Sequence, residues 1–263
     1  MTNWEVALLG IIQGISEFLP ISSSGHLEIA KVLMGNTLVQ KESLLLTIVL
    51  HGATALSTLF VFRKDIGELI RDLFLKQSKE SWRFVLFIVI SMVPAAVVGL
   101  FFESTIAALF SGNLIVVGSL LLCTGVLLYF ANRTPAESQP LSTRHAWWIG
   151  LAQAIAILPG LSRSGATIGT ALLLKVERPA AARFSFLMVI PLIFGSMAKS
   201  LLEFEAAEMS IAPLQLGIGF LTAFIAGVLA CKWMIALVNK SQLVYFSVYC
   251  AAAGIFALVY GSF

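Results

Sequence analysis

Two short polar segments interrupt an otherwise apolar chain, and the second of them has the side chains of an anion site. PGLSRSGAT, residues 159–167, places an arginine between two serines and adds a threonine in the first turn of the helix that follows. The guanidinium is permanently charged, the hydroxyls are donors, and backbone N–H groups stand free at a helix start. Phosphate matches this set in shape and charge. We therefore predict an anion site formed by Ser162, Arg163, Ser164, Gly165 and Thr167.

The first segment, EFLPISSSGH, carries side chains that can act on a bound phosphate. Glu17 lies four residues after Gln13, so the two share one helix face. Glu17 can ligate a hard divalent cation or accept a proton, while Gln13 can only support it by hydrogen bonding. His26 follows three serines, residues 22–24, where it suits a base that activates a serine, a nucleophile or an acid. Opposite an anion site, this set favours catalysis.

Both segments also have a purely structural interpretation. In it Arg163 is a counter-ion for Glu17, the serines are helix caps, and His26 is a satisfied polar residue. Two arguments favour a functional role. An arginine at membrane depth costs at least ~2.5 to 3.5 kcal/mol and so needs an anionic partner, and a cap needs only one hydroxyl. His51, inside another apolar run, is expected to make a helix-to-helix hydrogen bond.

The composition places these segments in a membrane protein. Of the 263 residues, 59% are hydrophobic and only 12% are charged, whereas ordinary globular proteins have about 25% charged residues. Several apolar runs are long enough to cross a hydrocarbon core of about 30 Å as helices. We predict an all-α, polytopic fold with six transmembrane helices, at residues 44–62, 84–102, 114–130, 184–202, 214–236 and 245–261.

Two further apolar segments, residues 4–34 and 146–175, are broken in the middle by the polar motifs. Each half is too short to span the bilayer, so we predict two re-entrant helix-loop-helix hairpins. GIIQGISEFLPISSSG aligns with GLAQAIAILPGLSRSG, and three crossings follow each hairpin. An odd number of crossings inverts the second copy, which is typical of inverted-repeat membrane folds. The chain is then one membrane domain with repeat halves 1–135 and 140–263.

Loop charges indicate the orientation, because cytoplasmic loops collect Lys and Arg. If both termini lie outside, most of the 17 basic residues fall on the cytoplasmic face, including those from Arg63 to Arg83 in one loop. The first hairpin then enters from outside and the second from inside, so that their tips meet within the membrane and the site faces the outer leaflet. The net charge of +3 reflects this loop asymmetry, and we expect no nucleic-acid partner.

The motifs QGISEFLPISSSGH and PGLSRSGAT resemble the two signatures of the bacterial undecaprenyl-diphosphate phosphatases, the bacitracin-resistance family. RFSFLMVIP and VPAAVVGLFF extend the similarity nearly from end to end. The resemblance implies hydrolysis of the C55 polyprenyl diphosphate to its monophosphate in the bacterial cytoplasmic (inner) membrane, with Mg²⁺ or Ca²⁺ assisting. This reaction recycles the lipid carrier for cell-wall synthesis. The resemblance places functional residues on Glu17, Ser23, His26, Ser162, Arg163 and Thr167, with Ser22 and Ser164 beside them.

Several alternatives stay open. Gln13 stands where many family members have glutamate, which leaves Glu17 as the one carboxylate for a metal. The preferred hypothesis is that Ser23 attacks the terminal phosphorus with help from His26. Attack by His26, or by a water that it activates, is the alternative. The alternative function is a transporter or flippase of a phosphorylated polyprenyl lipid, because inverted repeats are typical of transporters. The expected partners are the lipid substrate and the bilayer, and a homodimer is also open.

Overall fold

The protein is a bundle of α-helices. The computed structural model describes residues 1–34, 40–102, 113–135, 139–202 and 211–262. Within these ranges the regular elements are helices, apart from one bridge between Gln139 and Val176, so the all-α prediction is confirmed. In chain order the helices are α1 (Asn3–Phe18), α2 (Ser23–Leu33), α3 (Gln40–Val61), α4 (Arg63–Phe74), α5 (Lys79–Phe101), α7 (Leu114–Arg133), α8 (Thr143–Ile155), α9 (Arg163–Leu173), α10 (Arg178–Leu202), α11 (Pro213–Asn239) and α12 (Val244–Gly261).

Long helices coincide with each of the predicted crossings. Among the residues described, 5 helices are by themselves long and apolar enough to cross a membrane, namely α5, α7, α10, α11 and α12. The remaining one, α3, meets that test only together with α4, from which a bend of 69° separates it. The chain is therefore a multi-pass membrane protein with 5 such helices, or 6 if the bent pair forms one span. The exact number of crossings stays a prediction.

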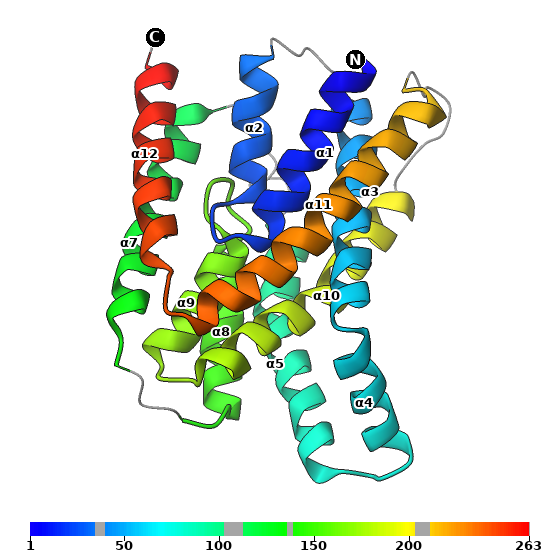
Figure 1. Cartoon of the computed structure of the whole chain (residues 1–263), viewed down its shortest axis with the longest axis vertical. Coiled ribbons are helices and arrows are strands. Elements are labelled where there is room, and N and C mark those ends of the chain that lie inside the picture. The colour runs from blue at the N-terminus through cyan, green and yellow to red at the C-terminus, as the bar shows by residue number, and fades with distance from the viewer. Residues whose placement is uncertain (35–39, 103–112, 136–138, 203–210, 263) are drawn as a thin grey trace.

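Helix α4 occupies a segment that the sequence analysis assigns to a charged loop. Its apolar residues Ile66, Ile70 and Phe74 recur every four positions, which is a helical spacing. Ile66 packs against the core, whereas Ile70 and Phe74 are exposed. Asp65 Oδ1 pairs with Arg183 Nε at 2.9 Å, which ties α4 to the beginning of α10. The helix projects from the end of the molecule opposite both termini (Figure 1).

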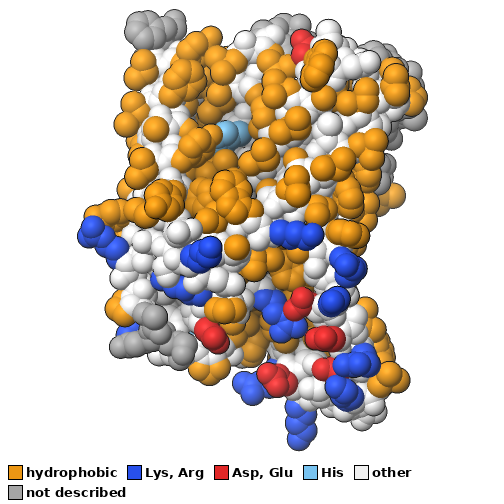
Figure 2. Space-filling view, in the orientation of Figure 1, with side chains coloured by type: hydrophobic (Ala, Val, Ile, Leu, Met, Phe, Trp, Pro, Cys, Tyr) orange, Lys and Arg blue, Asp and Glu red, His pale blue; other side chains and the backbone are white. Residues whose placement is uncertain are grey.

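Each polar motif lies at the turn of a helical hairpin. Helix α1 runs from the end that carries the N-terminus into the middle of the molecule, and α2 returns to that end (Figure 1). Helices α8 and α9 form a second hairpin, which rises from the opposite end. The surface differs between the two ends of the molecule. Apolar side chains cover the part around the first hairpin, and charged side chains gather toward the end with α4 (Figure 2).

The helices pack in reciprocal pairs. Helix α1 packs along α11 and α8 along α5, while α7 contacts α12 and α3 contacts α10. Each pair joins a helix that precedes residue 135 to one that follows residue 140. This is the pairing that an inverted repeat would produce. The repeat and its halves, 1–135 and 140–263, stay a prediction, and residues 136–138 and 263 lie outside the described residues.

Glycines bring both hairpins close to the long helices. A Cβ atom on Gly10 would lie 2.7 Å from the Gly219 carbonyl oxygen of α11. A Cβ atom on Gly150 would lie 2.6 Å from the Ser91 carbonyl oxygen of α5. These two glycines occupy matching places in the aligned motifs. Small residues of this kind allow backbones to approach closely in membranes, so the glycines fix the position of each hairpin and hence of its polar tip.

Candidate active site

The two hairpin tips touch each other in the middle of the molecule. Ser164 Oγ donates a hydrogen bond of 3.1 Å to the Leu19 carbonyl oxygen across the tips. A Cβ atom on Gly25 would lie 3.1 Å from Gly160 Cα, and one on Gly165 would lie 3.2 Å from Pro20 Cβ. A side chain at either glycine would therefore be crowded by the opposite tip. The two motifs that the sequence analysis singles out form one site, although they lie far apart in the chain.

Both returning helices begin with the same capping arrangement. Ser22 Oγ accepts a hydrogen bond of 3.2 Å from Gly25 N, and Ser162 Oγ accepts one of 3.1 Å from Gly165 N. Ser22 has a φ of 71°, a left-handed conformation that is uncommon for a residue with a side chain. The capping role proposed in the structural interpretation therefore holds for these two serines. It leaves Ser23 free to reach the other side of the tip.

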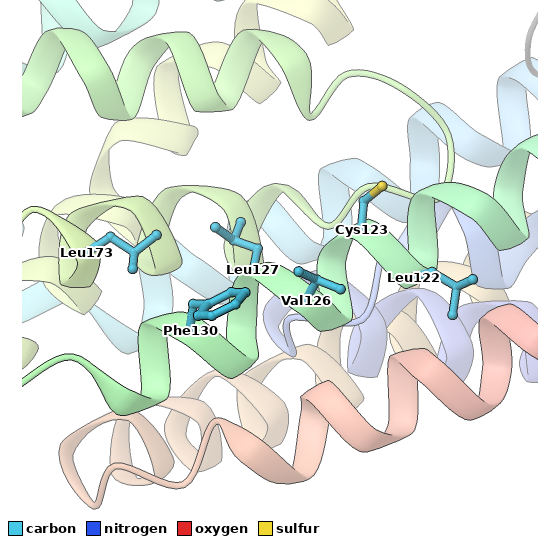
Figure 3. Close-up of a pocket in the computed structure, with 6 residues that line it drawn as sticks. All are labelled: Leu122, Cys123, Val126, Leu127, Phe130 and Leu173. Atoms are coloured by element: carbon cyan, nitrogen blue, oxygen red, sulfur yellow. The ribbon is translucent and has the colours of Figure 1, made fainter.

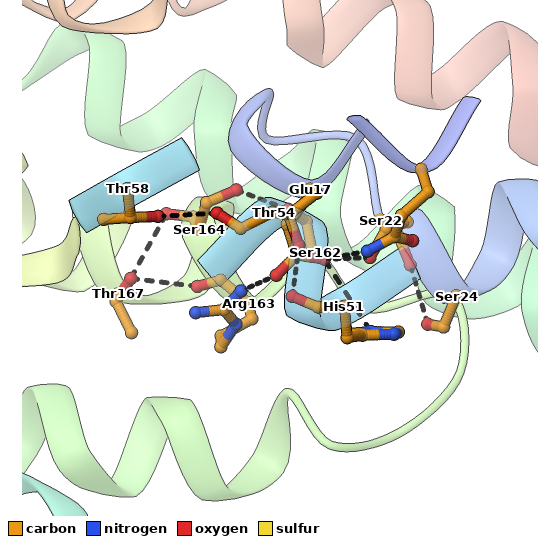
Figure 4. Close-up of polar contacts among 12 residues, drawn as sticks. Glu17, Ser22, Ser24, His51, Thr54, Thr58, Ser162, Arg163, Ser164 and Thr167 are labelled. Carbon is orange, nitrogen blue, oxygen red and sulfur yellow. Dashed lines mark hydrogen bonds and ion pairs between the residues drawn. The ribbon is translucent and has the colours of Figure 1, made fainter. Parts of the chain in front are cut away.

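Glu17 is the centre of the polar contacts. Its side chain is only 5% exposed, and Oε1 accepts a hydrogen bond from Arg163 Nη2. Oε2 accepts hydrogen bonds from Ser23 Oγ at 2.7 Å and from Gln13 Nε2 at 3.1 Å. Figure 4 shows that Glu17 and Arg163 point toward each other from the two hairpins. A buried carboxylate of this kind needs such partners, because an isolated charge would be costly there.

The other hydroxyls of the second tip hold the backbone. Thr167 Oγ1 donates to the Arg163 carbonyl oxygen at 2.9 Å. Ser164 Oγ, whose donor hydrogen goes to the first tip, also lies 3.2 Å from Ser162 Oγ. Similarly, Ser24 Oγ lies 3.4 Å from Ser22 Oγ in the first tip (Figure 4). In this state the hydroxyls fix the shape of the tips, and Arg163 supplies the charge. Their predicted contact with substrate stays a prediction.

His26 lies on the other side of the first tip. Its Nδ1 is 2.8 Å from the Ser22 carbonyl oxygen, and its Nε2 is 2.7 Å from the hydroxyl of Tyr249 in α12. The sequence analysis expects His26 to assist Ser23. Instead, the hydroxyl of Ser23 donates to Glu17, and both ring nitrogens of His26 have other partners. The proton acceptor beside Ser23 in this structure is therefore Glu17.

Three polar residues of other helices join the site. His51 Nδ1 is 2.9 Å from the Thr47 carbonyl oxygen, and its Nε2 is 3.9 Å from Glu17 Oε2 (Figure 4). The expected helix-to-helix hydrogen bond of His51 is thus wrong, because the ring bonds within α3 and faces the carboxylate. Thr124 Oγ1 accepts from Ser162 N at 3.0 Å and so holds the second tip against α7. Tyr249 is the third.

A signal for two of these residues was present in the sequence. His51 and Thr124 are polar side chains inside apolar helices, and such residues in membranes usually face the protein interior. Tyr249 gave no comparable signal, since a tyrosine on a lipid-facing helix is ordinary. Its contact with His26 depends on how α12 packs.

The oxygen atoms at the first tip could hold a hard cation, provided that water or phosphate supplies most of its ligands. Gln13 is completely buried, and its Oε1 has no hydrogen-bond partner. This amide oxygen, with Glu17 and the hydroxyl of Ser23, offers the oxygen ligands that Mg²⁺ and Ca²⁺ prefer. Among the described residues, no three His, Cys, Asp or Glu side chains gather around one point. The set thus suits an ion that keeps water or phosphate ligands, as Mg²⁺ commonly does.

A separate apolar groove of about 600 Å³ lies between α7 and α9 (Figure 3). Its walls are Leu122, Cys123, Val126, Leu127, Phe130 and Leu173. None of the polar residues of the tips takes part in this groove, so it has no place in the chemistry of the site.

The chain is similar to known proteins over nearly its whole length. Residues 6–256 match the family model described as bacitracin resistance protein BacA. The undecaprenyl-diphosphatase of Christiangramia forsetii is 51% identical over 260 residues, which cover 99% of this chain and 98% of that protein. The undecaprenyl-diphosphatase of Bacteroides fragilis is 45% identical over 263 residues, and that of Bacteroides thetaiotaomicron is 46% identical over 262. Each of these two alignments covers 98% of both chains.

Proposed function

Because this chain belongs to the bacitracin resistance protein BacA family, we propose that it is a membrane phosphatase that hydrolyses undecaprenyl diphosphate. The products are undecaprenyl phosphate and inorganic phosphate. The similar proteins named above are undecaprenyl-diphosphatases. The reaction returns the lipid carrier to cell-wall synthesis and confers resistance to bacitracin. The protein acts in the bacterial inner membrane, and the distribution of loop charges supports a site that faces the outer leaflet.

The observation that carries this proposal is the meeting of Arg163 with Glu17 and Ser23 where the tips touch. A guanidinium, a carboxylate and a hydroxyl in one buried cluster supply a phosphate binder, a proton acceptor and a nucleophile. Phosphoryl transfer needs mainly positioning and charge stabilisation. A transport pathway would not require a serine hydrogen-bonded to a carboxylate. The names of the relatives also favour the enzyme over a transporter or flippase.

Arg163 binds the diphosphate by exchanging the carboxylate of Glu17 for a phosphate group of the substrate. Its guanidinium leaves Glu17 and takes phosphate oxygens, for which its planar fork is well suited. The exchange leaves no unpaired cation at any stage. Backbone N–H groups in the first turn of α9 add donors at a helix N-terminus. The hydroxyls of Ser164 and Thr167 now donate to carbonyl oxygens, so direct contact with phosphate requires them to rotate.

The reaction proceeds in two steps. In the first, Ser23 Oγ attacks the terminal phosphorus and its proton passes to Glu17, since these two groups are already hydrogen-bonded. The bond to undecaprenyl phosphate breaks, and the leaving oxygen keeps the electron pair. In the second, a water attacks the phosphoserine and gives a proton to His26, while Ser23 Oγ leaves and takes its own proton back from Glu17. His26 then passes its proton to the released phosphate, so that the enzyme returns to its starting state and the net change is the addition of one water.

A divalent cation, Mg²⁺ or Ca²⁺, would be held by Glu17, the Oε1 atom of Gln13 and the hydroxyl of Ser23. When bound, it would neutralise charge on the phosphate oxygens. The unpartnered amide oxygen of Gln13 supports this assignment. Gln13 is neutral, so the protein contributes one negative charge, and the ion would depend on the substrate for the rest of its charge balance.

The test is phosphate release from undecaprenyl diphosphate by the purified protein in detergent, with and without a chelator. Detergent leaves no second compartment, so a pure transporter would release nothing. We expect Arg163→Ala to lose nearly all activity, at least about 100-fold, because it removes the charge that holds the transferred phosphate. Arg133→Ala is the matched control. Arg133 lies at the end of α7, over the ring of Tyr129, and its loss should leave the rate unchanged.

Two results would count against the proposal. Wild-type protein that stays folded and binds the lipid but releases no phosphate would exclude the enzyme. An Arg163→Ala variant that keeps most of its activity would exclude the site.

A further inference from the structure

We propose that Tyr249 of α12 is a positioning residue for His26, which it holds as a neutral acceptor at the membrane-facing side of the site. The proposal rests on the function proposed above and adds a residue that neither polar motif contains. Tyr249 and His26 come from opposite ends of the chain, and the hydrogen bond between them joins α12 to α2.

The hydrogen bonds select one tautomer of the neutral imidazole. The Ser22 carbonyl oxygen, 2.8 Å from Nδ1, can only accept, so Nδ1 carries a hydrogen. In the neutral ring Nε2 then has a lone pair. The hydroxyl of Tyr249, 2.7 Å away, donates to that lone pair. The two contacts select one tautomer, with Nε2 as the nitrogen that can accept a proton.

The two rings also fix the plane of the imidazole. The ring centroids of His26 and Tyr249 are 5.5 Å apart and the planes differ by only 15°. Helix α2 itself packs against α1 and α7, so α12 adds restraint from a third direction. A histidine held by the backbone on one nitrogen, by a hydroxyl on the other and by a stacked ring has little freedom left to turn.

The hydroxyl has a reason to be there beyond packing. Tyr249 is 44% exposed on a helix whose neighbouring residues Tyr245 and Val248 are 67% and 66% exposed. On the lipid-facing surface of α12, an apolar side chain at position 249 would pack equally well. A hydroxyl at an apolar boundary is costly without a partner, and the partner that it has is Nε2 of His26.

This arrangement determines the side of the imidazole from which the reacting water must approach. The proton that leaves the water in the second step must reach Nε2, the nitrogen with the lone pair. The hydroxyl of Tyr249 now occupies that direction. The water therefore takes the place of the hydroxyl at Nε2, and the ring contact keeps the imidazole aligned while it does so.

Two variants separate the two contacts of Tyr249. Tyr249→Phe keeps the ring and removes the hydroxyl. We expect kcat to fall about tenfold, with KM changed less than about twofold, because the imidazole is then held less firmly with Nε2 toward the place that the water takes. Tyr249→Leu removes the ring as well and should lose more. Tyr245→Phe, one turn away on the same helix, is the matched control and should behave as wild type.

Nitrogen NMR of ¹⁵N-histidine-labelled protein provides a readout that does not depend on activity. The signals of His26 are identified by their loss in His26→Gln. We expect the Nε2 resonance of His26 to move in Tyr249→Phe and to stay in place in Tyr245→Phe. An unchanged kcat together with an unmoved Nε2 resonance in Tyr249→Phe would overturn the proposal. A wild-type protein without phosphatase activity would instead overturn the proposed function, and the resonance would still report on the contact.

Discussion

In the proposed reaction, the substrate must break the ion pair between Glu17 and Arg163. Both side chains are largely buried, at 5% and 21% exposure, and each is the counter-ion of the other. A buried ion pair adds little stability by itself, but removal of one partner is strongly destabilising. A phosphate group can replace the carboxylate at Arg163 without leaving a bare cation. The same event frees Glu17 to hold a proton or a metal ion.

Glu17→Gln should therefore inactivate the protein and also destabilise it, by about 3 kcal/mol, because Arg163 loses its anion. Inorganic phosphate should restore part of the loss, since it supplies an anion to the free guanidinium. The measurement is the thermal unfolding midpoint in detergent with and without phosphate. Glu28→Gln is the control, as it breaks an ion pair with Lys31 nearer to the surface. If phosphate raised the unfolding midpoint of the wild type more than that of Glu17→Gln, the assigned role of the ion pair would be wrong.

The sequence was sufficient to single out the charged pair of the candidate site, whose part in catalysis stays a prediction. Glu17 and Arg163 stand out because charged side chains inside apolar helices are expensive and need a reason. The sequence did not predict which side chain forms the hydrogen bond with Ser23. The sequence favours His26 as the helper of Ser23, whereas the structure places Glu17 there. Which side chain reaches Ser23 depends on the turn at the tip, where Ser22 adopts a left-handed conformation that no composition or periodicity specifies.

At the level of helices, the hairpins depend on their neighbours for position. Helices α1 and α8 have 16 and 13 residues, so neither spans a bilayer comfortably by itself. Their depth is set by packing along α11 and α5. The glycines at these contacts leave no room for a side chain. A small error in either contact would move one tip away from the other and separate Glu17 from Arg163.

Gly150→Ala tests this dependence. The added Cβ would lie 2.6 Å from the Ser91 carbonyl oxygen, a backbone atom that cannot move away cheaply. We expect a loss of about 1 to 3 kcal/mol in stability and a fall in activity through displacement of the tip. Gly195→Ala in α10 is the matched control, because a Cβ atom added at Gly195 would meet nothing within 4 Å. There alanine should be neutral or slightly stabilising. Equal unfolding midpoints for the two variants would contradict the packing argument.

Helix positions were predictable where apolar runs are long, and α4 shows the limit. Each of the long helices overlaps a crossing expected from hydropathy, because length and composition suffice to indicate a span. Helix α4 carries charges between its apolar residues, so its hydropathy is that of a loop. Its spacing of Ile66, Ile70 and Phe74 was the available signal. The bend of 69° between α3 and α4 was not predicted from the sequence.

For the whole molecule, the chain ends and the charged surface lie at opposite poles. Both termini are at one end, and α4 with the adjacent turn is at the other (Figure 1). The ion pair between Asp65 and Arg183 joins α4 to the beginning of α10. If the end that carries α4 lies in the cytoplasm, as the loop charges predict, the first hairpin opens outward and the second inward.

Labelling of single cysteines in cells tests this orientation, in a background without the native cysteines. Gln77 is exposed in the turn that follows α4, Ser241 is exposed in the turn between α11 and α12, and Ser262 is exposed after α12. We expect Ser262→Cys to react with a membrane-impermeant thiol reagent added outside, and Gln77→Cys and Ser241→Cys to react only after the membrane is opened. Labelling of Gln77→Cys and Ser262→Cys from the same side would refute the arrangement.

The division of the site between two hairpins also constrains how the protein can be made. Glu17 and Arg163 are separated by 146 positions, so the ribosome completes the first hairpin long before it reaches the second. During that interval the carboxylate has no guanidinium, and a lone charge at membrane depth is unfavourable. If the second hairpin enters from the other side, as predicted, Glu17 gains its counter-ion only once Arg163 has been synthesised and inserted. Assembly of the site is therefore a late event in biosynthesis, and a chain truncated before the second motif would leave its first hairpin without a stable place in the membrane.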